Sequence, residues 1–320
     1  MTDITILKSG PFTTIQDQGR FGVQHLGVPR SGVLDHDALI IGNHLLGNKA
    51  QTSAFEICFG GFEARFDNHC HLTLTGSSAA KLQHLNHKGQ QTDHPAGTVI
   101  KIAPGDIITI PPFGDSLSVL LCVSGGIDVP AVYGSCSTTT NARLGGHEGR
   151  ILQASDILKL GKTGKAPPIP SAPLPLDKLF AKPTILRLLF GPQDHWFTSE
   201  ALANLSAEPY QILPQTSRMG MRLAGPSLPH KGPADIISDA MMRGTIQVPA
   251  DGQPIIAMAD HGTMGGYCKI GTIISADLSA LGRLRPHDKI SFEVVTMAEA
   301  QKYRLQHQQM IDHLLESLAS

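Results

Sequence analysis

Amide, carboxylate and guanidinium side chains occur together with glycine at residues 16–22, Gln-Asp-Gln-Gly-Arg-Phe-Gly, shortly after an apolar strand signal at 4–7. Glycine lets the main chain turn tightly or approach a ligand, whereas buried polar side chains are costly unless they are hydrogen-bonded. Gln16, Asp17 and Arg20 are therefore candidates for binding a carboxylate, a ureido group or a phosphate, with Asp17 orienting Arg20. The alternative is a β-turn in which Asp17 caps local N–H groups and Arg20 forms a surface ion pair.

A second group of ionisable side chains, Asp260, His261, Tyr267 and Lys269, follows the apolar run 255–258 and surrounds a Gly-Gly pair. Polar groups at strand ends commonly build sites on barrels. His261 or Tyr267 can serve as acid or base, and Lys269 can neutralise an oxyanion. The alternative is a Gly-Gly turn with a half-buried Tyr267 and a solvated Lys269.

Two more glycine-containing loops, 145–150 and 215–220, carry Arg150 and Arg218. The loop Gly-Gly-His-Glu-Gly-Arg is similar to an anion-binding nest of main-chain N–H groups, with Arg150 able to hold the anion. It lacks the Lys-Ser/Thr ending of a Walker A loop, so no nucleotide is assigned to it. We expect the polar loops to converge on one pocket supported by a β scaffold.

A helical pattern over residues 35–46 begins at Asp35, which is most simply an N-cap. Asn43 lies within this pattern among apolar neighbours, where a side-chain amide needs a partner. Two partners remain open for Asn43, a neighbouring main-chain carbonyl or a small amide-bearing substrate.

Five histidines (His69, His71, His84, His87 and His94) and Cys70 fall within twenty-six residues. Such side chains favour zinc, but no closely spaced ligand pair repeats, and the last three histidines are expected in a polar loop. We therefore assign no metal site. Cys136 and Cys268 have no base within a few residues, so a cysteine nucleophile is not favoured.

The composition excludes several classes of protein. Charged residues make up 17% of the 320 residues, the net charge is −1, and no run of like charges occurs. A basic footprint for nucleic acid is therefore missing, as is a polybasic membrane patch. With no eighteen-residue apolar run, no signal peptide expected and five scattered cysteines, a reduced, cytoplasmic protein is expected.

Short apolar runs punctuated by 33 glycines and 22 prolines favour a mainly β fold. The expected strands are 71–75, 99–102, 107–110, 117–123, 184–190, 245–248, 254–258 and 289–294. Expected helices are few: 35–46, 199–205 capped by Thr198, and a terminal helix over 297–318. Five prolines at 166–175 predict an extended linker. We therefore expect domains at 1–165 and 183–296, a linker at 166–182 and a C-terminal helix at 297–320.

Several longer segments resemble the biotin-dependent carboxyltransferase family. They are residues 12–22, 27–35, 43–48, 55–56, 123–130, 134–138, 145–150, 191–197, 218–220, 247–254 and 270–277, so the resemblance covers roughly residues 4 to 296. It implies tandem cyclophilin-like β-barrel domains and a second polypeptide that completes the site. The family includes 5-oxoprolinase subunits, allophanate hydrolase subunit 2, a kinase-inhibitor antagonist and half of the urea carboxylase carboxyltransferase domain.

The resemblance implies a subunit of an ATP-dependent 5-oxoprolinase, which opens a lactam to glutamate together with A-type and B-type subunits. ATP is then expected wholly or partly on the partner chains, and biotin is not expected on this chain, which has no Met-Lys-Met motif. Alternatives are carboxyl transfer from carboxybiotin to a urea-like amide, and a regulatory partner of the B-type protein without chemistry. The residues that match the family's motifs are Gln16, Asp17, Arg20, Asp35, Asn43, Arg218, Gln247, Asp260, Tyr267 and Lys269.

Two positions depart from the family's pattern. Cys136 and His261 each stand where a guanidinium is usual, which bears on the binding of an anionic substrate. The change at His261 also makes its surroundings sensitive to pH.

Overall fold

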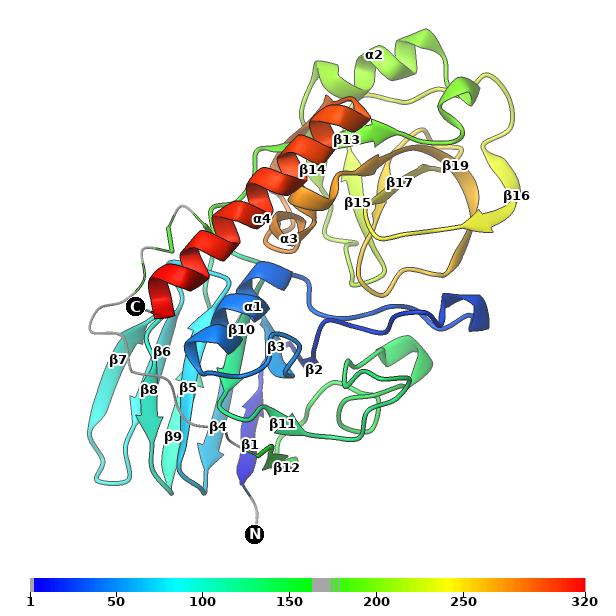
Figure 1. Ribbon diagram of the computed structural model, residues 1–320. Coiled ribbons are helices and arrows are strands. Elements are labelled where there is room, and N and C mark those ends of the chain that lie inside the picture. Colours follow the sequence, from blue (N-terminus) through cyan, green and yellow to red (C-terminus); the bar gives the residue numbers. More distant parts are fainter. Residues whose placement is uncertain (1–2, 163–173, 175, 178, 320) are drawn as a thin grey trace. The chain divides into compact units, whose positions relative to one another are not determined.

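The computed structural model describes residues 3–162, 174, 176–177 and 179–319. The chain forms two compact units (Figure 1). Unit 1 comprises Met1–Phe21, Ser31–Lys182 and Leu314–Ser320, and unit 2 comprises Gly22–Arg30 and Pro183–His313. Most of the expected linker at 166–182 lies outside the described residues, and the domain boundaries from the sequence stay a prediction.

Unit 1 contains two antiparallel sheets. The 7-stranded sheet has the order β11 (Ile127–Asp128), β12 (Ile157–Leu160), β1 (Ile4–Ser9), β4 (Phe62–Phe66), β9 (Asp106–Ile110), β6 (Lys81–Leu85) and β7 (Gln91–Pro95). The 5-stranded sheet has the order β2 (Phe12–Gln16), β3 (Ala54–Cys58), β10 (Ser118–Val123), β5 (Cys70–Thr75) and β8 (Ile100–Ile102). A short 3-10 turn, η2 (Thr140–Ala142), lies in the loop between β11 and β12.

The core of unit 1 lies between its two sheets. Ile4 and Phe62 from the 7-stranded sheet belong to the same buried cluster as Phe55 and Leu121 from the 5-stranded sheet. Strand β10 is buried along its whole length, because helix α1 (His36–Leu45) packs on it and on β5 (Figure 1). A strand covered on both faces is expected to be apolar throughout, as Ser-Val-Leu-Leu-Cys-Val nearly is.

Unit 2 is built around a closed barrel of seven strands. These are β13 (Ile185–Phe190), β20 (Lys289–Val294), β14 (Tyr210–Ile212), β15 (Gly220–Ala224), β18 (Ile255–Ala257), β17 (Thr245–Val248) and β19 (Met264–Ile273), and the pairing of β13 with β19 closes the ring. Strand β16 (Asp235–Ala240) pairs only with β19 in the described chain and stands outside the ring. Closure removes the free sheet edges that an open sheet would expose.

Short helical elements accompany the barrel: η1 (Gln24–Leu26), η3 (Asp194–Trp196), α2 (Ser199–Ala207), η4 (Ser275–Asp277) and α3 (Leu278–Leu281). Thr198 caps α2 by accepting a hydrogen bond from the Ala201 N–H at 3.0 Å. Helix α4 (Met297–Ala319) follows the last strand. Within unit 2 it is fixed by Tyr303, whose ring lies 3.9 Å from the guanidinium carbon of Arg187, and Arg187 is itself paired with Asp277.

The mainly β fold with few helices and a C-terminal helix is confirmed. All three expected helices are present within one or two residues of their expected ends. The expectation that His84, His87 and His94 lie in a polar loop was wrong for two of them, because His84 and His94 lie on the paired strands β6 and β7. This hairpin lies at the edge of its sheet, and its largely exposed polar sequence carries no apolar alternation that would reveal it.

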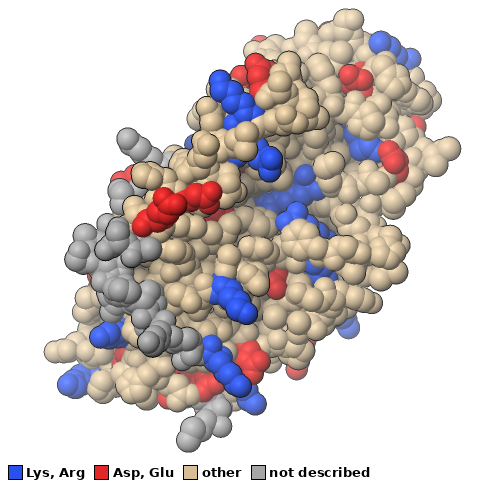
Figure 2. Space-filling model, viewed as in Figure 1, with Lys and Arg blue, Asp and Glu red and all other residues tan. Residues whose placement is uncertain are grey.

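Among the described residues, no helix is both long and apolar enough to cross a membrane. On the face seen in Figure 2, basic and acidic side chains are interspersed and separated by wide uncharged areas. This distribution agrees with the near-zero net charge of the chain.

Candidate functional site

Asp17 organises a loop that is distant in sequence. Its Oδ1 accepts hydrogen bonds from the hydroxyls of Ser135 and Ser137, both at 2.5 Å, and from the Gly19 N–H at 2.8 Å. Its Oδ2 accepts the Cys136 N–H at 2.6 Å. A carboxylate that receives four donors is a strong local anchor. In this structure the two oxygens of Asp17 hold the 135–137 segment and its own turn.

Arg20 is also hydrogen-bonded to this loop, and Arg20 is 1% exposed. Its Nε donates to the Val132 carbonyl at 3.1 Å, Nη1 to the Thr139 hydroxyl at 3.0 Å and Nη2 to the Ser137 carbonyl at 2.5 Å. A Cβ atom at Gly145 would lie 2.4 Å from Nη2 of Arg20, so this glycine is required for the close approach. The geometry gives Arg20 a structural role in place of the solvated ion pair weighed from the sequence.

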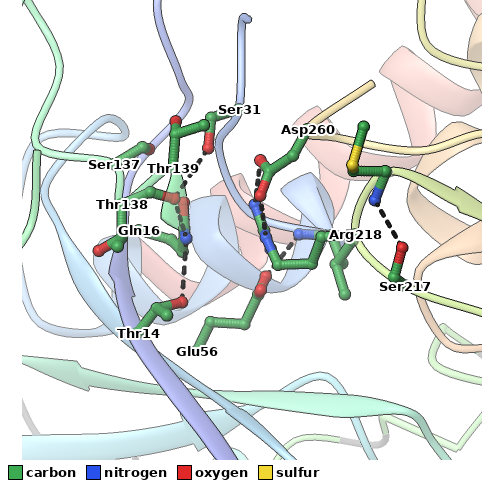
Figure 3. Close-up of polar contacts among 12 residues, drawn as sticks. Thr14, Gln16, Ser31, Glu56, Ser137, Thr138, Thr139, Ser217, Arg218 and Asp260 are labelled. Carbon is green, nitrogen blue, oxygen red and sulfur yellow. Dashed lines mark hydrogen bonds and ion pairs between the residues drawn. The ribbon is translucent and has the colours of Figure 1, made fainter. Parts of the chain in front are cut away.

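Gln16 contacts the same loop through the nitrogen of its side-chain amide. Its Nε2 donates to the Thr14 hydroxyl and to the Thr138 carbonyl, both at 2.9 Å (Figure 3). The Thr138 carbonyl also accepts the Ser31 hydroxyl at 3.1 Å. The Oε1 of Gln16 is buried and has no hydrogen-bond partner among the described residues.

The two sequence candidates on helix α1 have structural partners. Asp35 is the N-cap, and its side chain accepts the Ala38 N–H at 3.1 Å. Asn43 donates to the carbonyls of Thr52 at 2.8 Å and Ala50 at 3.3 Å, and its Oδ1 accepts from Asn48 at 3.0 Å. The carbonyl alternative therefore accounts for Asn43, whose amide ties the end of α1 to the following turn.

Arg150 forms a bidentate ion pair with Asp156, in which both N–O distances are 2.8 Å. Its Nε also donates to Glu148 at 3.0 Å. Burial raises the pKa of Asp156, but hydrogen bonds from Arg150 and from the Gln153 N–H outweigh burial and hold the pKa below its ordinary value. Arg150 is therefore paired with two carboxylates of its own chain, and its role as an anion ligand stays a prediction.

In unit 2, Arg218 and Asp260 face each other as a buried ion pair (Figure 3). Nε of Arg218 donates to Oδ2 of Asp260 at 2.9 Å and Nη2 donates to Oδ1 at 3.0 Å. The main chains are also joined, because the Asp260 N–H donates to the Arg218 carbonyl at 2.7 Å. Both oxygens of Asp260 thus accept from one guanidinium, an arrangement that fixes the orientation of Arg218.

His261, the next residue, is 2% exposed. Its Nδ1 lies 2.7 Å from the Gly262 carbonyl, which assigns the proton to Nδ1 and leaves Nε2 as the acceptor nitrogen. Burial lowers the pKa of His261 below 6.5, and the charges of Arg243 and Arg30 lower it further. These effects outweigh the Gly262 hydrogen bond and the Asp260 charge, which raise the pKa. A neutral imidazole with a free acceptor nitrogen can take up a proton.

Lys269, on strand β19, has a side chain that is 5% exposed and donates to Asp239 of β16 at 2.6 Å. Gln247 donates to the main-chain carbonyl of Tyr267 at 3.4 Å. Tyr267 is 40% exposed, and its hydroxyl has no hydrogen-bond partner in the described chain. Lys269 is thus not the solvated lysine of the alternative interpretation, while Tyr267 is half-exposed as that interpretation expected.

No group of three or more metal-ligating side chains suited to a metal ion occurs among the described residues. Asp106 instead gathers two of the histidines, with His84 Nε2 at 2.8 Å and His87 Nδ1 at 3.1 Å. For Cys136, burial first and then the charge of Asp17 raise the pKa, which disfavours the thiolate a nucleophile would need.

The structure thus brings the candidates together in two groups. Unit 1 gathers Gln16, Asp17 and Arg20 on the 132–139 loop, and unit 2 gathers Arg218, Asp260 and His261. The convergence of both groups on one pocket stays a prediction, because the groups belong to different units. The sequence analysis missed Asp239, Arg243 and Arg30 as neighbours of these side chains. No spacing signal connects them, since each comes from a distant segment.

Residues 26–294 match the family described as "Carboxyltransferase domain, subdomain A and B". Proteins named as the C subunit of 5-oxoprolinase, from Haemophilus influenzae and Escherichia coli, are 36% and 34% identical to this chain; the alignments cover 98% and 97% of it and 97% of each relative. A crystal structure of the Kluyveromyces lactis urea amidolyase has the same fold, with a TM-score of 0.86 at 24% identity over 98% of this chain and 20% of that protein.

The match to the family covers most of the chain, and the two bacterial relatives are similar to it over nearly their full lengths. The chain belongs to the carboxyltransferase domain family, subdomains A and B.

Proposed function

We propose that this chain is one component of an ATP-dependent 5-oxoprolinase and acts with A-type and B-type subunits. The observation that carries the proposal is the similarity to two bacterial 5-oxoprolinase C subunits over 97–98% of all the chains compared. Those relatives are named as subunits, so the activity is assigned to a complex. ATP is expected to bind wholly or partly on the partner chains.

The chemistry requires activation of a poor electrophile. The lactam amide of 5-oxoproline resists attack by water, so its carbonyl oxygen must be activated, for example by phosphorylation, before the ring opens. In this scheme Gln247 bonds the amide edge of the substrate and an arginine holds its carboxylate. The partnered amide of Asn43 is removed from the substrate contacts, because its three bonds are used within the fold.

Within this proposal, the contacts in unit 2 support different roles for its acidic and basic side chains. His261 is the candidate general base: its Nδ1 donates to the Gly262 carbonyl, and its lowered pKa keeps the ring neutral, so that Nε2 can accept a proton from a reacting group. Asp260 is a positioning residue that holds Arg218 through two hydrogen bonds. Arg218 is then the candidate for the substrate carboxylate, in the orientation that Asp260 imposes.

A second candidate function is carboxyl transfer between carboxybiotin and a urea-like amide. The family description favours it, as does the 28% identity to the urea amidolyase of Saccharomyces cerevisiae over 91% of this chain. That relative is much longer, since the match covers 16% of its length. This function requires biotin on another chain.

The test is a reconstitution with purified A-type and B-type subunits. We expect release of glutamate and ADP from 5-oxoproline and ATP by the complete mixture, and no carboxylation of urea when a biotinylated carrier protein is supplied. Carrier-dependent turnover of urea without lactam opening would favour the second function. Tight complex formation without turnover of either substrate would indicate a regulatory partner.

A further inference from the structure

The loop at residues 143–149 of unit 1 borders two cavities that none of the roles above uses. The larger cavity, of about 610 Å³, is lined by residues 145–149, by residues of strands β11 and β12, and by the segment that follows β11. The smaller one, of about 400 Å³, lies beside Phe12, Thr140 and Arg150. Arg143, Glu148 and Gly149 line both cavities, so Arg143 stands where the two adjoin.

Two basic side chains at the larger cavity are not engaged by the protein. Arg143 and Lys159 are exposed, and neither forms an ion pair or a side-chain hydrogen bond with any described residue. By contrast, Arg150 nearby is held by Asp156 and Glu148. Asp128 is the acidic neighbour of Lys159 across the β11–β12 ladder.

The backbone of the loop supplies further donors. Gly145, Gly146 and Gly149 have no side chains and therefore line the cavity with their main chain. The N–H groups of Gly146 and Gly149 are bonded internally, whereas those of Gly145, His147 and Glu148 have no acceptor among the described residues. Residues 145, 146, 148 and 149 all have positive φ angles between 55° and 66°. Within this run, only His147 does not have a positive φ, and it is followed by Glu148 with φ of 55°. Such a change from right-handed to left-handed backbone forms the concave nests of N–H groups that bind anions.

Arg143 is held in place by the same loop. Its main chain adopts the left-handed conformation, with φ of 50°. A Cβ atom at Gly149 would lie 2.2 Å from the Arg143 carbonyl carbon, so the two segments are in close contact. A non-glycine residue kept in this conformation costs about 1 kcal/mol or more and is found disproportionately at ligand-binding positions.

Part of the lining of the larger cavity is apolar. It consists of Val129, Pro130, Val132 and Ile157, and Ile157 is 53% exposed. A ligand that suits this cavity has an anionic end for Arg143, Lys159 and the free N–H groups, and a flat or apolar part for the apolar lining. The volume of about 610 Å³ accommodates a molecule of nucleotide size.

We propose that this cavity binds the phosphate groups of a small phosphorylated molecule, with Arg143 and Lys159 as the charged ligands and the 145–148 main chain as the neutral ones. The phosphates belong either to a nucleotide, whose base lies on the apolar lining, or to a smaller phosphorylated compound. The proposal rests on residues of unit 1 alone and does not depend on 5-oxoproline being the substrate.

The test is isothermal titration of the purified full chain with ATP, ADP, pyrophosphate and inorganic phosphate. We expect saturable binding of at least one of them, weakened roughly tenfold by Arg143→Gln and by Lys159→Gln, since each removes a charge-assisted hydrogen bond. Lys101→Gln is the matched control, because Lys101 is exposed on β8 of the same unit and lines neither cavity. Raising the ionic strength should weaken binding to the wild type.

The titration series also identifies the source of the phosphate. Tighter binding of ATP or ADP than of pyrophosphate indicates a nucleotide, and equal affinities indicate a smaller phosphorylated compound. Circular dichroism shows whether each variant is folded. If Arg143→Gln does not fold, Lys159→Gln still tests the proposal. The proposal is overturned if none of the four compounds binds, or if the folded variants bind them as tightly as Lys101→Gln does.

Discussion

Arg218 and Asp260 are joined by two side-chain hydrogen bonds, at 2.9 and 3.0 Å, and by one main-chain bond at 2.7 Å. Their side chains are 7% and 3% exposed. Removing one member of a buried ion pair is far more costly than the net contribution of the pair, because the other charge keeps its desolvation cost. Through these bonds Asp260 helps to hold the orientation of Arg218.

Replacing Asp260 with asparagine should lower the free energy of unfolding by about 3 kcal/mol, since the variant retains the shape but loses the charge that faces Arg218. Urea denaturation of the purified chain measures this change. Asp235→Asn is the matched control, because Asp235 is an exposed carboxylate of the same unit, and its change should stay within about 0.5 kcal/mol. Equal stability of the two variants would contradict the assignment.

The approach of Gly145 to Arg20 gives a prediction for the loop of unit 1. Gly145→Ala places a methyl group 2.2 Å from the Ser137 carbonyl oxygen and should cost about 3 kcal/mol or more, because main chain has to move. Gly134→Ala is the control: its φ of 77° is similar, but nothing lies within 4 Å of the added methyl group. Thermal denaturation of both variants measures the two costs. Gly134→Ala reports the cost of positive φ alone, about 1 kcal/mol, and the additional loss of stability in Gly145→Ala reports the clash.

His261 should make stability depend on pH. Its pKa is lowered in the folded chain, mainly by burial, so protonation favours the unfolded state. The contribution is fully present above pH 6.5 and is lost as the pH falls through the lowered pKa. Replacing His261 with glutamine should therefore reduce the loss of stability between pH 7.5 and pH 5, by about 1.4 kcal/mol per unit of pKa shift.

Unfolding free energies at the two pH values measure the effect of His261. His195→Gln is the matched control, because the His195 side chain is 66% exposed and should leave the wild-type pH dependence in place. If the unfolding free energy of His261→Gln depends on pH as strongly as that of the wild type, the fold does not oppose protonation of this imidazole.

Asp106 is a further titratable anchor, in unit 1. Burial raises its pKa, but hydrogen bonds from the Ala103 and His87 N–H groups and from the rings of His84 and His87 outweigh burial and lower it. Asp106→Asn should therefore cost about 1–3 kcal/mol at pH 7. The difference from wild type should shrink below pH 3.8, where the stabilising carboxylate becomes protonated.

The exposed carboxylate of Asp93 on β7 supplies the comparison, and Asp93→Asn should change stability little at either pH. Guanidinium denaturation at pH 7 and pH 3 measures both variants. A constant difference between Asp106→Asn and wild type across this range would contradict the anchoring role of the carboxylate.

The sequence predicted those parts of the fold in which local pattern and tertiary environment agree. The expected strand at 117–123 is β10 because both of its faces are buried, and the helix that starts at Asp35 has a capping carboxylate followed by apolar spacing. The β6–β7 hairpin escaped prediction, because its pairing is made by main-chain bonds between polar residues. The β propensities of the individual residues do not indicate which strands pair.

The sequence identified many of the residues of the candidate site, but it predicted less well what each of them does. Asp17, Arg20 and Asn43 were correctly singled out as polar groups that need partners, and the structure supplies those partners from segments up to 120 residues away. A sequence shows that a buried amide or guanidinium needs hydrogen bonds, but not whether protein or ligand provides them. The pairing of Lys269 with Asp239 is a further case, because Asp239 lies 30 residues away on a different strand, β16.

The most direct measurement for the proposed function is an omission experiment on the reconstituted complex. Glutamate formation from 5-oxoproline and ATP is followed with the A-type and B-type subunits alone, and then with this chain added. We predict turnover only in the complete mixture, and its reduction by at least tenfold with His261→Gln in a chain that still joins the complex. Full turnover without this chain, or none with all three components present, would contradict the account.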